Sequence, residues 1–128
     1  MRLLLDTHAL IWWLEGNRRL SEPAQLAIAD EENEVLVSAA SAWEVATKSR
    51  LGRLPGTAAL ARDVSGAIAS QDFTELPITV ADAVRAGSLP GPLRDPFDRI
   101  LITQAQVRDL LLVSNETLFD AYGVRRLW

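Results

Sequence analysis

The stretch Arg2-Leu3-Leu4-Leu5-Asp6 opens the chain with a short apolar run that ends on a carboxylate. An apolar run of this length, bounded by a polar residue, is typical of a buried strand. A carboxylate beside a core needs a physical reason, because an unpaired charge is costly to remove from water. Three further acids, Glu44, Asp98 and Glu116, follow apolar runs or open helices. The sequence therefore predicts an acidic site next to a core.

Expected strands alternate with expected helices along the whole chain. We predict strands at residues 2–5, 34–38, 110–113 and 124–127, and a short strand or extended segment at 73–78. Three of these strands are essentially apolar, as in parallel sheets that carry helices on both faces. We predict helices at residues 9–14, 21–30, 38–49, 57–68, from 79 onwards, 95–108 and 115–122. This alternation predicts an α/β fold, and the length of 128 residues suits one domain over 1–128.

Polar residues mark where most of the helices are expected to begin. Ser21 and Asp95 are favoured N-caps, each followed by a proline in the first turn. Thr79 and Asp82 have the spacing of a capping box. Thr7, Thr57 and Asn115 are the expected caps of three further helices.

The composition limits the chemistry that the chain can perform. It has no cysteine and a single histidine, His8, so zinc–thiolate sites, imidazole clusters and cysteine nucleophiles are excluded. A metal would have to be held by oxygen atoms, which favours Mg²⁺ or Mn²⁺. The longest apolar run, residues 9–14, is too short to span a bilayer. We therefore expect a soluble cytoplasmic protein that does not enter a membrane.

The net charge of −4 argues against broad binding of nucleic acid, because proteins that bind it in this way usually carry an excess of basic residues. Lys48, Arg50 and Arg53 form a local group downstream of Glu44. This group is either a rim that contacts phosphate or an ordinary solvated loop. His8 is expected to be packed or hydrogen-bonded rather than a general base.

The four acids are expected to meet at one edge of the sheet. In open parallel sheets, the ligand crevice lies at the carboxyl ends of the strands. Asp6, Glu44 and Glu116 lie at or just beyond such ends, and Asp98 opens a helix that leads into the last buried strand. Carboxylates at close quarters raise one another's pKa, and a bound Mg²⁺ removes that repulsion. Metal-dependent cleavage of a phosphodiester bond by an activated water suits this residue set.

Each acid also has a structural interpretation that the sequence leaves open. Asp6 is a metal ligand or a phosphoacceptor, or it caps a helix. Glu44 fits a capping box with Ser41, although its helix is expected to begin earlier, which would leave that box unused. Asp98 belongs either to the site or to a capping arrangement around Asp95, and Glu116 is either a fourth carboxylate or a first-turn glutamate.

Four blocks of this chain resemble the PIN-domain family, in its VapC-type toxin branch of type II toxin–antitoxin pairs. They are residues 3–14 (LLLDTHALIWWL), 37–46 (VSAASAWEVA), 95–105 (DPFDRILITQA) and 112–124 (LVSNETLFDAYGV). The blocks occur in family order and span nearly the whole chain.

The resemblance implies a fold, an activity and partners. The fold is a three-layer α/β/α sandwich with a central, mostly parallel sheet. The activity is Mg²⁺-dependent endoribonuclease cleavage, with Mn²⁺ as a possible substitute. The implied partners are an RNA substrate, a small VapB-type antitoxin, and further copies in a homodimer or a higher toxin–antitoxin assembly.

The resemblance also implies roles for individual residues. Asp6, Glu44 and Asp98 match the acidic positions of the family, with Asp6 and Asp98 on the metal. Glu44 would bind a second metal or orient the attacking water. The fourth position is usually an aspartate, and Glu116 stands there, one methylene longer, so contact through water is open. The supporting residues are Thr7, Ser114 and Asn115.

Two other hypotheses remain open on the sequence alone. A phosphoacceptor domain would use Asp6, but it would also want an acidic pair before it and a lysine near the end of the chain. The only lysine is Lys48, and the first expected strand carries no second acid. A catalytically weak module that keeps the fold and binds RNA or protein is the other alternative, because of Glu116.

Overall fold

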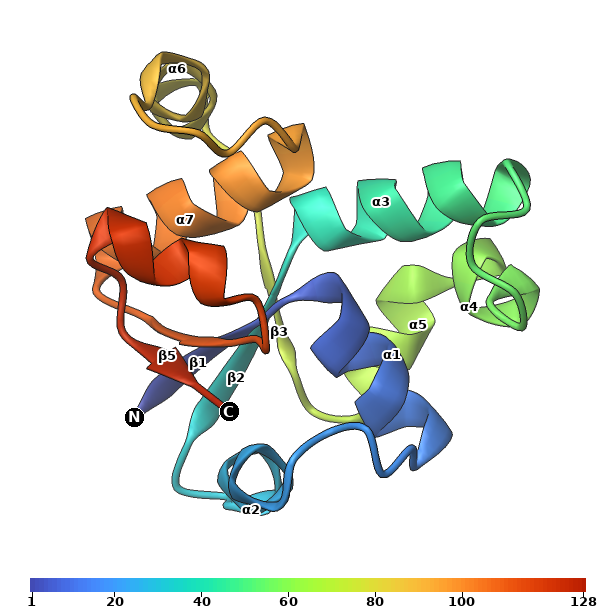
Figure 1. The fold of residues 1–128 in the computed structure, drawn as a ribbon. Coiled ribbons are helices and arrows are strands. Elements are labelled where there is room, and N and C mark those ends of the chain that lie inside the picture. The colour runs from blue at the N-terminus through green and yellow to red at the C-terminus, as the bar shows by residue number, and fades with distance from the viewer.

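Five parallel strands form the centre of the molecule in a computed structural model that describes residues 1–128 (Figure 1). Their order in the sheet is β3-β2-β1-β4-β5, and every neighbouring pair is parallel. Leu5 lies opposite Val37 on one side and Val113 on the other. The strands are β1 (Arg2–Leu5), β2 (Glu34–Ser38), β3 (Thr74–Leu76), β4 (Leu111–Val113) and β5 (Arg126–Leu127). The expected parallel α/β fold is confirmed.

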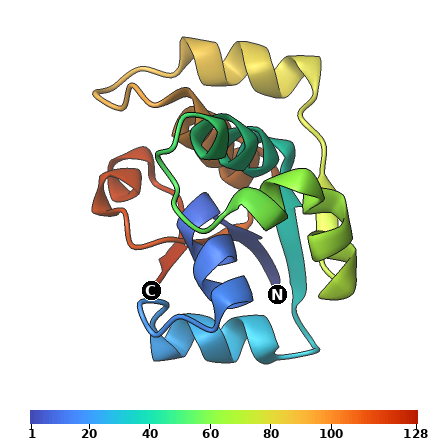
Figure 2. The same ribbon diagram turned by 90° about the vertical axis from the view of Figure 1, so that its right-hand side faces the viewer.

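Helices cover both faces of the sheet, which makes three layers (Figure 2). They are α1 (Thr7–Glu15), α2 (Glu22–Ala29), α3 (Ala39–Arg50), α4 (Ala58–Arg62), α5 (Val64–Ser70), α6 (Val80–Ser88), α7 (Pro96–Arg108) and the 3₁₀ helix η1 (Thr117–Tyr122). None of these helices combines the length and the apolarity that a bilayer crossing requires.

The central strand β1 supplies side chains to both halves of the core. Leu3 and Leu5 point into a cluster with α1, α2 and α5, whereas Leu4 points into a second cluster with α7. All three leucines are fully buried. This division follows from the two-residue alternation of a strand, and it explains why an uninterrupted apolar run forms β1.

One long helix expected over residues 57–68 is two helices in the structure. The chain leaves helical geometry at Asp63 (φ −153°, ψ 70°), which separates α4 from α5. The Asp63 carboxylate accepts a hydrogen bond from the Gly66 N–H (2.9 Å) and so starts α5. Thr57 occupies the N-cap position of α4 as predicted, but it makes no capping hydrogen bond, because its hydroxyl donates to the Leu54 carbonyl instead (2.6 Å).

Two further cap predictions are each displaced by one residue. Asp6, not Thr7, caps α1 and accepts from the Ala9 N–H (2.8 Å). Glu116, not Asn115, caps η1 and accepts from the Leu118 N–H (3.0 Å). The caps expected at Ser21, Thr79 and Asp95 are confirmed.

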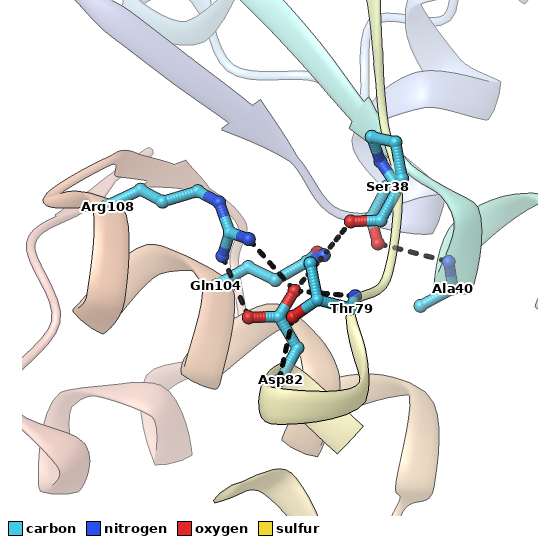
Figure 3. A network of polar contacts seen from close by, with 7 residues as sticks. Ser38, Ala40, Thr79, Asp82, Gln104 and Arg108 are labelled. Carbon is cyan, nitrogen blue, oxygen red and sulfur yellow. Dashed lines mark hydrogen bonds and ion pairs between the residues drawn. The ribbon is translucent and has the colours of Figure 1, made fainter. Parts of the chain in front are cut away.

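A buried network around Asp82 attaches α6 to α7 (Figure 3). Both guanidinium nitrogens of Arg108 donate to the Asp82 carboxylate, each at 3.0 Å. Gln104 donates to the Pro77 carbonyl (3.1 Å) and to Asp82 (3.4 Å). Burial alone would raise the pKa of Asp82, but the hydrogen bonds from Arg108, the Thr79 N–H and Gln104 outweigh it and leave this pKa lowered.

We predict that Arg108→Ala lowers the free energy of unfolding by roughly 2–3 kcal/mol at pH 7, because it leaves a buried carboxylate without its partner. Urea denaturation measures this loss. Because the pKa of Asp82 is lowered in the folded state, the advantage of the wild type is present above about pH 4 and disappears as Asp82 is protonated in acid.

The matched control is Arg125→Ala. Arg125 also pairs with an aspartate, Asp109, but both side chains are largely exposed, at 57% and 89%. An exposed pair contributes about 0–1 kcal/mol, so this variant should stay close to the wild type. Equal losses in the two variants would show that burial of Asp82 does not strengthen its ion pair.

Candidate acidic active site

The order of the strands places a crevice between β1 and β4. Strands β2 and β3 are added on one side of β1. The chain then returns across the sheet, and β4 and β5 are added on the other side of β1. Connections leave in opposite directions at such a switch point, which opens space at the carboxyl ends of the two strands. Asp6 follows β1 there and Ser114 follows β4. The Asp6 N–H donates to the Val113 carbonyl (3.1 Å), which holds the two strand ends together.

Two helices bring the other acids to the same edge. Helix α7 leads directly into β4, so its N-terminus lies near the end where β4 finishes. Asp95 caps α7 by accepting from the Asp98 N–H (3.1 Å), and this fixes Asp98 in the first turn. Helix α3 packs against α1 and α7 and carries Glu44, which is only 5% exposed.

All four predicted acids line one pocket of about 300 Å³. Its walls are formed by Asp6, Thr7, His8, Trp12, Glu44, Lys48, Asp95, Asp98, Asn115, Glu116 and Phe119. The sequence-predicted residues Thr7 and Asn115 are therefore part of the pocket, and Ser114 lies buried just behind it. The structure brings together the residues that the sequence picked out.

Three of the four acids are engaged by neighbours, Asp6 through its capping bond with the Ala9 N–H. Glu44 forms an ion pair with Lys48 and accepts a hydrogen bond from the Thr7 hydroxyl. The Thr7 and Ser41 hydroxyls are 3.2 Å apart, which ties α1 to α3 beneath Glu44. Glu116 turns toward its own helix as the cap of η1. No three acidic side chains are grouped closely enough to form a complete metal-ligand set.

Asp6 and Asp98 have raised pKa values. Burial raises the pKa of Asp6, and the Ser114 hydroxyl and the Ala9 N–H oppose that rise. Burial, followed by the negative charges of Asp95, Glu44 and Asp6, raises the pKa of Asp98 to about 7. Desolvation would lower the pKa of Lys48, but its contacts with Glu44 outweigh that effect and raise it. The pocket therefore lacks positive charge, and Lys48 neutralises only one of its carboxylates.

The donor atoms fit a hard divalent cation. The pocket offers carboxylate and hydroxyl oxygens and no sulfur, which matches the preference of Mg²⁺ or Mn²⁺. Asp6 and Asp98 are buried or partly buried, and neither forms an ion pair with a basic side chain. These two side chains could hold such an ion, whereas Glu44 would first have to loosen its pair with Lys48.

Some expectations about the surroundings of the site need correction. His8 makes no hydrogen bond and is exposed at the pocket rather than in the core, although its ring lies against that of Trp12 (5.4 Å between centroids). Of the three cations proposed as a rim, only Lys48 lines the pocket. Asp6 is 8% exposed and holds the start of α1, which argues against a phosphoacceptor role.

Three further side chains line the pocket that were not predicted as part of the site, and one of them, Phe119, belongs mainly to the core. The other two bear on its chemistry. One is Asp95, which we assigned only to capping and whose charge acts on Asp98. The other is Trp12, which lies one helical turn after His8 on α1. That spacing of four residues puts two side chains on the same face of a helix, and it was visible in the sequence.

Comparison with known proteins supplies the family. The family model of the PIN domain matches residues 3–124. The chain belongs to the PIN-domain family. The resemblance indicated by the four sequence blocks is thus confirmed. A search of curated protein sequences found no significant match to this PIN domain.

Solved structures share the fold of this PIN domain across nearly the whole chain. A chain of VapBC2 from Rickettsia felis, bound to a DNA fragment from its promoter, has a TM-score of 0.69 at 12% identity and covers 99% of this chain and 98% of its own. FitAcB from Neisseria gonorrhoeae has a TM-score of 0.66 at 22% identity, and the match covers 98% of this chain and 96% of FitAcB. VapC20 from Mycobacterium tuberculosis, a sarcin-ricin loop cleaving toxin, gives 0.66 at 16% identity, covering 95% of each chain. The PIN domain thus has the fold seen in toxin–antitoxin systems.

We predict that Asp98→Asn stabilises the PIN domain at pH 8 when divalent cations are chelated. The raised pKa of Asp98 means that the folded state binds its proton more tightly than the unfolded state, so stability falls as the pH rises from about 4 through about 7. The amide of asparagine does not ionise, so the variant avoids this loss in the free energy of unfolding, which amounts to roughly 1–2 kcal/mol after solvent screening.

Thermal unfolding of the wild type and Asp98→Asn at pH 5 and pH 8, both with EDTA, measures the effect. The gain should be present at pH 8 and largely absent at pH 5. A variant that is less stable than the wild type at pH 8 would show that the Asp98 carboxylate is well accommodated without a cation.

Proposed function

We propose that this PIN domain is a Mg²⁺-dependent endoribonuclease and the toxin of a toxin–antitoxin pair. The observation that carries the proposal is the convergence of four carboxylates in one pocket at the switch point of the sheet, with raised pKa values at Asp6 and Asp98. Such a pocket is short of positive charge, and a divalent cation supplies that charge and can then attract the negative phosphodiester.

Each acid has a distinct role in this proposal. Asp6 and Asp98 would hold the cation, and Ser114 and the Ala9 N–H favour the ionised form of Asp6. When bound, Mg²⁺ would offset the charge of the scissile phosphate and lower the pKa of water. Glu44, held by Thr7, would orient the water that adds to phosphorus. That water gives up a proton to solvent, and the leaving ribose oxygen takes one up as its bond to phosphorus breaks. Lys48 lies in the same pocket, and its ammonium group can contact the phosphate once Glu44 turns to the water.

The proposed partner is a small VapB-type antitoxin. The structures of VapBC2 and FitAcB support this proposal through their shared fold. Assembly with further copies of the chain is part of the same proposal. The antitoxin is expected to suppress cleavage when it is added in equal amount to the purified PIN domain. Cleavage that is unaffected by an antitoxin shown to bind this PIN domain would contradict this part of the proposal.

We predict that the purified PIN domain cleaves cellular RNA in Mg²⁺ and that EDTA or Asp98→Asn abolishes cleavage, with a loss of at least about 100-fold. The control is Asp109→Asn. Asp109 ends the same helix, α7, at its opposite end and is exposed, and its left-handed backbone (φ 52°) suits asparagine. Separation of the RNA fragments on a gel measures both activities. Undiminished cleavage by Asp98→Asn would rule out the acidic pocket as the catalytic site.

We predict a smaller effect for Glu116→Gln, a loss of roughly 10- to 100-fold in cleavage rate. Glutamine keeps an oxygen that can accept from the Leu118 N–H, so η1 retains its cap while the charge is removed. The folded fraction, from circular dichroism, should match the wild type. A full rate in Glu116→Gln would assign Glu116 to capping alone.

One observation favours a second candidate function, a PIN module that binds RNA or protein without cleaving it. Lys48 neutralises Glu44, and no three acids form a ready ligand set. This candidate predicts a folded protein that binds RNA with or without Mg²⁺ and leaves it intact. The RNA cleavage assay separates the two candidates, because only the nuclease requires Asp98.

A further inference from the structure

The acidic pocket has an aromatic wall, formed by His8 and Trp12, that the proposed chemistry does not use. Both residues lie on α1, four positions apart, and both line the pocket. Their ring centroids are 5.4 Å apart, with an angle of 48° between the planes. The ring of Trp128 lies 5.8 Å from that of Trp12. Trp12 therefore lies near two other aromatic rings, and of the three residues His8 and Trp12 line the pocket.

The aromatic wall is firmly held at one end and open at the other. Trp12 and Trp128 pack against the core cluster that contains Leu3 and Leu5. His8 is exposed, so its ring contributes little to the core. Trp12 packs against the core, and its ring limits the movement of the His8 ring beside it. The aromatic wall thus presents a preformed apolar surface beside the carboxylates.

Electrostatics alone gives this pocket little affinity for RNA. The chain has a net charge of −4, and five acidic side chains line the pocket: Asp6, Glu44, Asp95, Asp98 and Glu116. Lys48 is the one basic side chain among the lining residues, apart from His8, and it is paired with Glu44. A cation at the acids would attract one phosphate, but an acidic chain lacks the basic footprint that usually supplies affinity for nucleic acid. Another source of binding energy is needed.

We infer that the aromatic wall stacks an unpaired nucleobase of the RNA next to the scissile phosphate. This inference rests on the proposed function, because it assigns the substrate class of the same site. Every base has a π-face, and stacking on aromatic side chains is a general means of holding single-stranded nucleic acid. A base within a duplex cannot reach a wall inside a pocket, so the substrate is RNA with unpaired bases at the cleavage point. His8 and Trp12 are positioning residues, and the carboxylates perform the chemistry.

The test measures binding separately from cleavage. Asp98→Asn serves as the background that prevents turnover, and the probes are two fluorescein-labelled octamers in Mg²⁺. One is oligouridine, and the other has the same sugar–phosphate backbone without any bases. Fluorescence anisotropy should show tighter binding of oligouridine. His8→Ala should weaken oligouridine binding about tenfold and leave binding of the base-free octamer unchanged.

Matched variants separate stacking from the polar character of the imidazole and from a general loss of packing. His8→Phe keeps an aromatic ring without a titratable group, so it should restore binding if stacking is the role of His8. Trp12→Leu should weaken oligouridine binding about tenfold, whereas Trp13→Leu should not. Trp13 is also half-buried on α1, but it contacts Phe73 and Gln71 and does not line the acidic pocket. In the protein with an intact Asp98, His8→Ala should raise KM about tenfold and leave kcat within about twofold.

The outcomes separate this inference from the proposed nuclease function. Equal affinity of the Asp98→Asn background for the two octamers, or unchanged oligouridine binding when His8→Ala is added, overturns the stacking inference while RNA cleavage still stands. Base-dependent binding that is lost in His8→Ala, in a protein that cleaves no RNA, supports the stacking wall and contradicts the nuclease. If Trp12→Leu does not fold, the comparison of His8→Ala with His8→Phe decides the matter, because His8 is exposed.

Discussion

The parallel pairing of β1 with β4 is the constraint on which the rest of the structure depends. It places β1 in the middle of the sheet, with β2 on its other side, so the chain must reverse its direction of sheet growth there. The hydrogen bond from Asp6 to Val113 continues this pairing one residue beyond the strand. Because strand ends at a switch point open a crevice, the residues that follow β1 and β4 face a shared space.

The crevice combines two properties that oppose each other. The surrounding apolar core removes water, and this raises the free energy of every carboxylate that points inward. The first turn of α7, the end of β1 and the buried face of α3 nevertheless each contribute one. Lys48 offsets the charge of Glu44, whereas Asp6 and Asp98 have no basic partner. Unpaired carboxylates in such a crevice lower the stability of the folded protein. Arrangements of this kind are common at functional sites.

Much of the fold and of the candidate site was predictable from the sequence, for identifiable reasons. Apolar runs such as residues 2–5 need cover on both faces, which indicates a parallel sheet, and the acids that follow these runs then fall at one edge. The break at Asp63 was not predicted, because the apolar spacing from Leu60 to Ile68 continues across it. The pairing of Glu44 with Lys48, and the turn of Glu116 toward η1, depend on competition among nearby partners that spacing alone does not reveal.

The central claim is that the acidic pocket binds a divalent cation through carboxylates that resist ionisation without it. Titration calorimetry with Mg²⁺, repeated at pH 7 in buffers of different ionisation enthalpy, measures the protons released on binding. Because the pKa of Asp98 is about 7 in the free protein, binding should release on the order of half a proton per site at pH 7 and almost none at pH 8.5. Absence of Mg²⁺ binding, or binding without proton release at pH 7, would contradict the account.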